Sequence, residues 1–181
     1  MKNPKKIILW SIGVLAVAIF IALKSGFYPI VLTSKWLITE RQFNKIVTSS
    51  LTYFQKTISV YATSTPVISA ESKKEIRRAA LDMMIEDKII NEVLAEKMGA
   101  RELKNSVDSK LAALGINDDV AKASQVFYNL SLKDFGNLVL TPEAKREILK
   151  ERGIDIQEIK KSRQPIILAP EFYWQDGVLM R

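Results

Sequence analysis

The stretch SKKEIRRAALDMMIEDKIINEVLAEKMG, residues 72–99, decides the fold class of this chain. It contains no glycine or proline before Gly99, and a glycine suits the left-handed backbone at the end of a helix. Ser72 and Glu75 have the spacing of a capping box, which predicts that a helix starts there. The apolar residues behind it recur at helical intervals: Ile76, Ala80, Met83, Met84, Ile90, Leu94 and Met98. The stretch therefore predicts a long helix with one buried face in a mostly α-helical domain.

A second helix is predicted upstream, beginning at Thr39. Thr39 and Gln42 form another capping box, in which each side chain bonds to the backbone N–H of the other residue. The cluster of turn-forming residues at 63–66 ends this helix. Its expected buried face consists of Phe43, Ile46, Val47, Leu51, Phe54 and Ile58.

Shorter helices are predicted downstream, where capping residues and glycines punctuate the apolar pattern. Packed in series, they would form a bundle with the long helix. The first expected helix covers 100–114 and ends at Gly115, and the second is capped by Asn117 or Asp118 and runs to Leu130. The third is capped by Ser131 and starts at Leu132, and the fourth starts at Thr141 and Pro142 and runs to Gly153.

The C-terminal residues 164–181 differ from the helical region. They are rich in β-branched and aromatic residues, are interrupted by Pro170, and contain Asp176 and Gly177 as a turn signal. We expect a short strand or hairpin, paired with the segment from Ile30 to Ile38.

The N-terminus carries an apolar run, IILWSIGVLAVAIFIAL at residues 7–23, preceded by Lys2, Lys5 and Lys6. About 17 helical residues span roughly 26 Å, which just crosses a bilayer. A cleaved signal peptide is the alternative, but Ala22 to Lys24 is a poor cleavage site. Basic residues before the run place the N-terminus in the cytoplasm and the remainder outside it.

These patterns predict a single-pass protein of the cell membrane, whose helical domain is extracytoplasmic. The expected parts are a basic leader and transmembrane anchor at 1–24, a juxtamembrane segment at 25–38, a helical domain at 39–163 and an extended segment at 164–181.

Composition excludes much catalytic chemistry. The chain has no cysteine and no histidine, which removes thiolate nucleophiles, Cys/His zinc sites and imidazole acid–base catalysis. The net charge is +7, but the three leader lysines contribute part of it, and acids and bases are interleaved elsewhere. We therefore expect no catalytic residues, metal or cofactor, and no nucleic-acid partner.

Three blocks of sequence resemble a known family: ITERQF, AALDMMIEDKIINEVLAEKMG and VFYNLSLKDFGNLVLTPEAKREIL. Their order and spacing are similar to the N-terminal domain of SurA-type periplasmic chaperones and of the related PrsA-like and PpiD-like membrane-anchored foldases. The resemblance covers roughly residues 36–150. The matching residues are Ile38, Thr39 and Phe43, then Leu81, Asp82, Met84, Ile85, Asp87, Ile89, Ala95 and Gly99, then Tyr128, Leu130, Ser131 and Phe135.

The chain departs from this family in three ways. Residues 33–35 replace a Val-Asn-Gly turn, and Asn129 replaces a glycine. Asparagine tolerates the left-handed region better than most residues, so the second change is mild. About thirty residues follow Lys150, too few for the parvulin isomerase domain of the family. The resemblance therefore implies a non-enzymatic module without prolyl isomerase activity.

In the resembling family, the helical unit binds non-native polypeptides through a broad apolar surface. This implies a holdase-like chaperone role here. The alternatives are a structural or assembly subunit that binds one folded envelope protein and a degenerate isomerase-family foldase. Oligomeric state and client identity stay open. Candidate client contacts are Met83, Met84, Met98, Phe127, Tyr128 and Phe135, although each also fits a role in the core.

Three carboxylates lie close together in the predicted long helix: Asp82 and Glu86 are four residues apart, and Asp87 follows Glu86. Such spacing brings them near one another on a helix, as a carboxylate pair for acid–base or metal chemistry requires. No histidine or cysteine is available to complete such a site, so a solvated charged face is the simpler interpretation.

Overall fold

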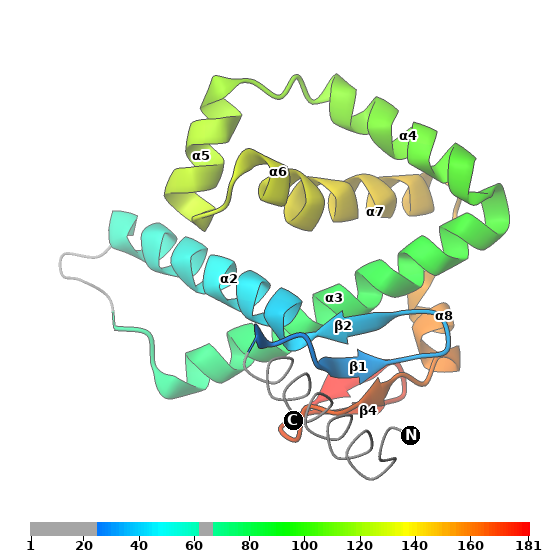
Figure 1. The fold of residues 1–181 in the computed structure, drawn as a ribbon, viewed down its shortest axis with the longest axis horizontal. Helices are drawn as coiled ribbons and strands as arrows, with labels where there is room; N and C mark the ends of the chain where they lie inside the picture. The colour runs from blue at the N-terminus through cyan, green and yellow to red at the C-terminus, as the bar shows by residue number, and fades with distance from the viewer. Residues whose placement is uncertain (1–24, 62–66) are drawn as a thin grey trace, which may run out of the picture.

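The structure is a computed structural model that describes residues 25–61 and 67–181. It is mostly helical, with short strands near both ends of this region (Figure 1). The elements are, in order, β1 (Pro29–Leu32), β2 (Leu37–Thr39), α2 (Glu40–Tyr61), α3 (Ala70–Met98), α4 (Ala100–Ala113), α5 (Asp118–Tyr128), α6 (Leu132–Phe135), the π-helical segment η1 (Gly136–Leu140), α7 (Thr141–Glu151), α8 (Ile156–Ser162), β3 (Ile166–Ile167), β4 (Tyr173–Gln175) and β5 (Val178–Met180).

Helix α3 lies at the centre of the molecule and contacts α2, α4, α7, α8 and β5. Leu81, Ile85 and Ile89 are completely buried, as expected for a helix that is covered on several sides. In Figure 1, α4 and α5 lead away from the end of α3, and α6, η1 and α7 return between α4 and α3. The prediction that a long helix organises a helical domain is confirmed.

The C-terminal residues complete this fold. β3 pairs antiparallel with β1, so the first sheet has the order β2-β1-β3, and β4 pairs with β5 in a separate hairpin. Phe172 and Leu179 lie in the core, which explains why this extended segment packs against the helices. The prediction of a C-terminal strand and hairpin, paired with the segment around β1, is confirmed.

The capping box at the start of α2 is also confirmed. The Gln42 N–H donates to the Thr39 hydroxyl at 3.3 Å, and the Thr39 N–H donates to the Gln42 side-chain oxygen at 3.1 Å. The predicted buried face is wrong beyond the middle of the helix, because Phe54 is exposed. The second half of α2 extends past the core that Phe43 and Val47 help to fill.

The predicted cap of α3 is wrong. The N-cap is Ser69, three residues before Ser72, and its hydroxyl accepts from the Ser72 N–H at 3.0 Å. The predicted helix from Thr141 with Pro142 in its first turn is present as α7, but Thr141 does not cap it, because η1 leads directly into α7 with helical backbone at Leu140. A side-chain cap is not needed where the preceding residues are already helical.

The prediction of a single-pass membrane protein is corrected. Among residues 25–61 and 67–181, no helix is both long and apolar enough to cross a membrane. Helix α3 is the longest of them, but charged residues such as Glu86, Asp87 and Lys88 interrupt its apolar face. The expected span at 7–23 and its basic leader lie outside the described residues. The transmembrane helix is therefore removed from the fold class, and the membrane localisation is withdrawn with it.

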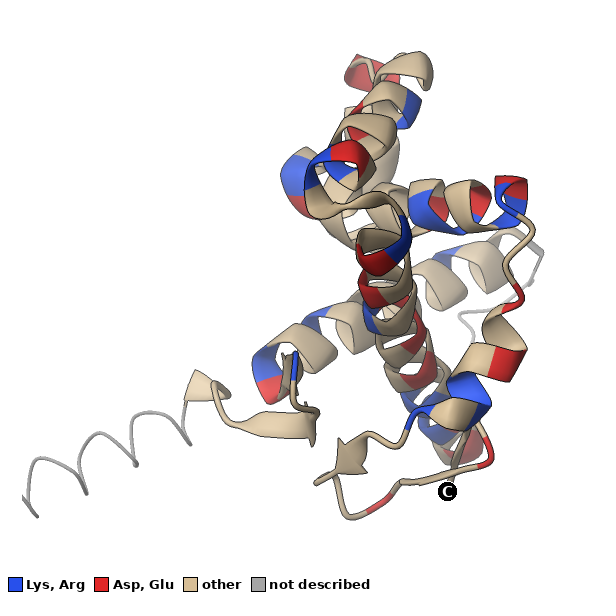
Figure 2. Ribbon diagram, turned by 90° about the vertical axis from the view of Figure 1, so that its right-hand side faces the viewer, with Lys and Arg blue, Asp and Glu red and all other residues tan. Residues whose placement is uncertain are grey.

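Charged residues of both signs are interleaved along the helices (Figure 2). Among the described helices, α3, α4 and α7 each carry acidic and basic side chains along their length, and many of these form ion pairs between helices. This arrangement agrees with the pattern expected from the sequence.

Candidate functional site

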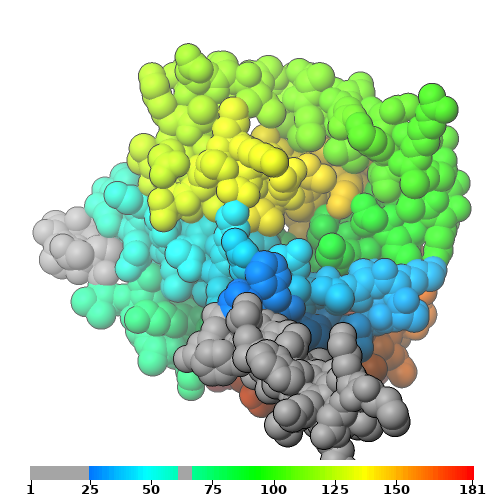
Figure 3. Space-filling view, viewed as in Figure 1, coloured from blue at the N-terminus to red at the C-terminus, as the bar shows by residue number. Residues whose placement is uncertain are grey.

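A cleft of about 280 Å³ lies between α2, α3, the α5–α6 connection and the continuous helix η1–α7. Figure 3 shows the face on which η1 and α7 approach α2 and α3. This volume lies just below the range of pockets for drug-sized ligands, and it suits one or two amino-acid side chains. We call it the central cleft. Its apolar walls consist of Ile46, Met83, Leu130, Leu138, Val139 and Pro142.

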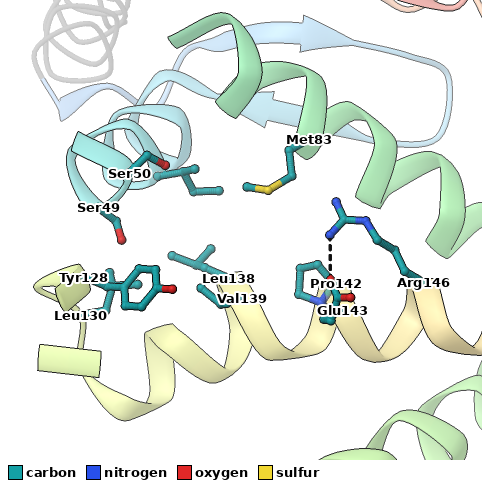
Figure 4. A pocket seen from close by; sticks show the side chains of 11 residues that line it. Ser49, Ser50, Met83, Tyr128, Leu130, Leu138, Val139, Pro142, Glu143 and Arg146 are labelled. Atoms are coloured by element: carbon teal, nitrogen blue, oxygen red, sulfur yellow. Dashed lines mark hydrogen bonds and ion pairs between the residues drawn. The ribbon is translucent and has the colours of Figure 1, made fainter. Parts of the chain in front are cut away.

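Polar groups line the two ends of the central cleft (Figure 4). Ser49 and Ser50 of α2 and the Tyr128 hydroxyl lie at one end. Glu143 and Arg146 of α7 lie at the other, where the Arg146 Nη1 donates to Glu143 at 3.2 Å. An apolar cavity with a few polar groups is typical of a binding site.

A smaller pocket of about 140 Å³ adjoins the central cleft. The two share Ile46, Met83, Leu138 and Pro142. The smaller pocket adds a more polar rim, made by Gln42, Asp87, Lys88 and Asn137, and reaches Met84. Because Met83 lines both pockets and has a flexible thioether side chain, its rotamer can adjust the space between them.

The π-helical segment η1 explains how Pro142 enters a continuous helix. Proline has no backbone N–H, and its ring clashes with the carbonyl group four residues earlier in a regular α-helix. Here the Thr141 N–H donates to the Gly136 carbonyl five residues back, which widens the turn before Pro142. This wide turn contains Leu138 and Val139, two residues that line the central cleft.

Three aromatic rings flank the Ser49 end of the cleft. Tyr53 of α2 stacks on Tyr128 with ring centroids 4.8 Å apart, and Phe135 lies 5.0 Å from Tyr128 in a tilted arrangement. Burial raises the pKa of Tyr128, and the neighbouring Tyr53 raises it further. The Tyr128 hydroxyl therefore keeps its proton at neutral pH and is available as a hydrogen-bond donor.

The structure brings together some of the six predicted contact residues. Met83 and Tyr128 line the central cleft, Met84 lines the adjoining pocket, and Phe135 supports the Tyr128 ring. Met98 packs against the core at the far end of α3. Phe127 is exposed and lines neither pocket.

Sequence reasoning missed the contributions of α2 and η1. Ile46 was assigned only to a buried face, and Tyr53, Leu138 and Val139 were not considered as site residues. The adjacent Tyr53 and Phe54 were a usable signal, because neighbouring residues of a helix do not share one face and at least one aromatic ring must then lie outside the buried face.

The carboxylates Asp82, Glu86 and Asp87 form ion pairs between helices. Asp87 accepts from Lys145 at 3.0 Å, and Glu86 accepts from Arg146 at 3.2 Å and from Lys160 at 3.3 Å. Asp82 also pairs with Lys160. The interpretation as a solvated charged face is wrong in this respect, because these side chains connect α3 to α7 and α8.

No cluster of metal-ligating side chains is found. Within residues 25–61 and 67–181, no group of three or more Asp, Glu, His or Cys residues is placed to hold a metal ion. Each of the three carboxylates of α3 already has a cationic partner, which disfavours an acid–base role for them.

Comparison with protein-family models, curated proteins and solved structures finds no match to this chain. The resemblance to SurA-type N-terminal domains therefore stays a prediction from sequence. The central cleft is the feature from which function is argued.

Proposed function

We propose that this chain is a chaperone-like module that holds apolar segments of non-native polypeptides in the central cleft. The observation that carries the proposal is an apolar cavity that is open to the surface and flanked by exposed aromatic residues. The resemblance of the helical blocks to a chaperone family supports it independently.

The lining of the cleft suits varied clients. Met83 is flexible and polarisable, and such side chains repack around apolar groups of different shape. The aliphatic residues Leu138 and Val139 provide apolar contacts that do not require a client side chain of one particular shape. The polar groups lie at the ends of the cleft, where the client chain enters or leaves.

Exposed apolar residues also lie on α2, α5 and α6, the elements near the Ser49 end of the cleft. A solvent-exposed apolar surface of this kind indicates an interaction site in a folded protein. Because α2 contacts α5, these side chains belong to neighbouring elements. They are Tyr53 and Phe54 of α2, Val126 and Phe127 of α5, and Leu132 of α6.

The size of the cleft favours transient binding. Burial of two aliphatic side chains contributes roughly 3–6 kcal/mol. The loss of translational and conformational freedom of the client on binding offsets much of this free energy. Weak, reversible binding to many clients is what a holdase requires, whereas a permanent subunit interface buries a larger area.

The test is suppression of client aggregation by the full chain, followed by light scattering at near-stoichiometric ratio. Met83→Gln makes the wall of the cleft polar, so we expect a several-fold weaker suppression. Met98→Gln is the matched control, since Met98 lies on the same helix but outside the cleft. Thermal melting of both variants shows that each is folded.

Two results would contradict the proposal. One is that the unmodified chain leaves the aggregation of several unrelated clients unchanged. The other is that Met83→Gln and Met98→Gln suppress aggregation equally well. Recovery of one stable, stoichiometric complex in a pull-down, without effect on unfolded clients, would instead support the assembly-subunit alternative.

A further inference from the structure

The central cleft continues into the adjoining pocket through an apolar constriction. The four residues that line both spaces are all apolar, and each comes from a different element: Ile46 from α2, Met83 from α3, Leu138 from η1 and Pro142 from α7. Figure 4 shows Met83 and Leu138 extending toward each other from opposite walls. The two pockets are therefore consecutive parts of one groove.

The groove follows the axis of α2. Gln42 lines only the adjoining pocket, Ile46 lines both spaces, and Ser49 and Ser50 line only the central cleft. Successive positions in this series are about one helical turn apart, so the two pockets are offset by roughly 5–6 Å along α2. Side chains that are near neighbours in one polypeptide have a comparable separation.

The size of each pocket limits what it can hold. An apolar cavity of about 150 Å³ accommodates one benzene molecule. The adjoining pocket has a volume of about 140 Å³, so it has room for one aliphatic side chain or a single ring. The central cleft has a volume of about 280 Å³ and has room for a larger side chain.

The constriction keeps the two volumes separate. Ile46 is 7% exposed and Pro142 is buried, so neither can leave the passage without disturbing the packing around it. A single long side chain would have to pass between these residues to fill both pockets. Two shorter side chains avoid the passage, because each occupies its own pocket.

We infer that the groove selects clients with two neighbouring apolar side chains, one held in the central cleft and the other in the adjoining pocket beyond the Met83–Leu138 constriction. This inference rests on the proposed function and adds a determinant of client choice to it. A client with an isolated apolar side chain fills only one of the two pockets. Segments with clustered apolar residues, as in helices and strands that form a core, are therefore preferred.

The experiment measures binding of fluorescent peptides to the full chain by anisotropy. One set carries two leucines separated by zero to three serines between Gly-Ser flanks, and a reference peptide carries one leucine. Two subsites predict that the best two-leucine peptide binds about 5- to 20-fold more tightly than the reference, because a second leucine is removed from water. A single subsite would give about twofold at most, since the second leucine would then only be an alternative occupant.

Asn137→Trp tests the adjoining pocket by itself. Asn137 is exposed on the rim of this pocket and does not line the central cleft, so an indole there can fill the pocket without entering the core. The ratio of the two affinities should fall to about two or below. Ser50→Trp fills part of the central cleft instead and should lower the ratio in the same way. Asn105→Trp, exposed on α4 and outside both pockets, is the matched control and should preserve the ratio.

Thermal melting of each variant shows that it is folded. A ratio of about two or less for the unmodified chain would overturn the inference and leave the proposed function standing, because clients would then occupy one pocket alone. A high ratio that Asn137→Trp leaves unchanged would overturn it in the same way. Absence of binding to every peptide would overturn both proposals.

Discussion

At the scale of single residues, backbone conformation explains several choices in the sequence. Asn129 ends α5 with φ +52°, in the left-handed region, and its N–H donates to the Gln125 carbonyl. This is the position where the resembling family has glycine, and asparagine adopts the same backbone at modest cost. Gly177, in the turn between β4 and β5, is more constrained. Its φ is +82°, and a Cβ atom there would lie 2.9 Å from the Lys161 backbone nitrogen.

Gly177→Ala should therefore destabilise the protein by about 3 kcal/mol, through left-handed strain and a backbone clash together. Gly115→Ala separates the two effects, because Gly115 also has positive φ but nothing within 4 Å of the added Cβ. We expect about 1 kcal/mol for that variant. Urea denaturation measures both, and equal losses would show that the turn does not press against α8.

At the scale of elements, short polar contacts position the helices around the cleft. Ser131 caps α6, accepting from the Asp134 N–H at 3.1 Å, and Asp134 pairs with Lys45 of α2 at 2.6 Å. The ion pair with Lys45, followed by the hydrogen bond from Ser131, lowers the pKa of Asp134. This contact joins α6 to α2 beside the aromatic rings of Tyr53 and Tyr128.

The lowered pKa gives the contact a defined pH dependence. Because the folded pKa lies below that of the unfolded chain, the stabilisation is fully present above the unfolded value and is lost as pH falls through the folded one. Asp134→Asn should therefore lower the melting temperature more at pH 7 than at about pH 3, which lies below the unfolded pKa. Circular dichroism at both pH values measures this. Asp108→Asn, in an exposed pair within α4, is the control and should change neither melting temperature appreciably.

At the scale of the whole molecule, Glu86 connects the cleft to the C-terminal segment. It accepts from Arg146, which lines the cleft on α7, and from Lys160 of α8, which is 4% exposed and lies over the Trp174 ring. Through Lys160, Trp174 of the C-terminal segment is therefore connected to the carboxylate that pairs with Arg146 at one end of the cleft. The molecule is held together by this network as well as by its apolar core.

Glu86→Gln should lower the free energy of unfolding by about 2 kcal/mol, because two cations lose part of their compensation. The cost stays below that of a fully buried pair, since the Glu86 side chain is 20% exposed. Glu143→Gln removes only the surface partner of Arg146 and should cost about 0.5 kcal/mol or less. Equal effects in urea denaturation would show that Glu86 has no special role.

The sequence by itself determined the elements that local chemistry specifies. Helical periodicity predicted α3, the Thr39–Gln42 box predicted the start of α2, and Asp176–Gly177 predicted the turn of the C-terminal hairpin. These features depend on residues within a few positions of one another, so they can be predicted from the sequence alone. The caps expected at Ser72 and Thr141 were wrong, because a residue suited to capping does not end a helix when the residues before it are also helical.

Only the tertiary structure decided where the site lies. The central cleft joins Ile46, Met83 and Leu138, which come from three helices far apart in the chain, and the side of Met83 that stays uncovered depends on how η1 packs. The same holds for Ser49, an ordinary helix residue in the sequence that lies beside Tyr128 at one end of the cleft. Periodicity identifies a buried face, but the opposing surface, and any space left between the two, follows from packing between distant segments.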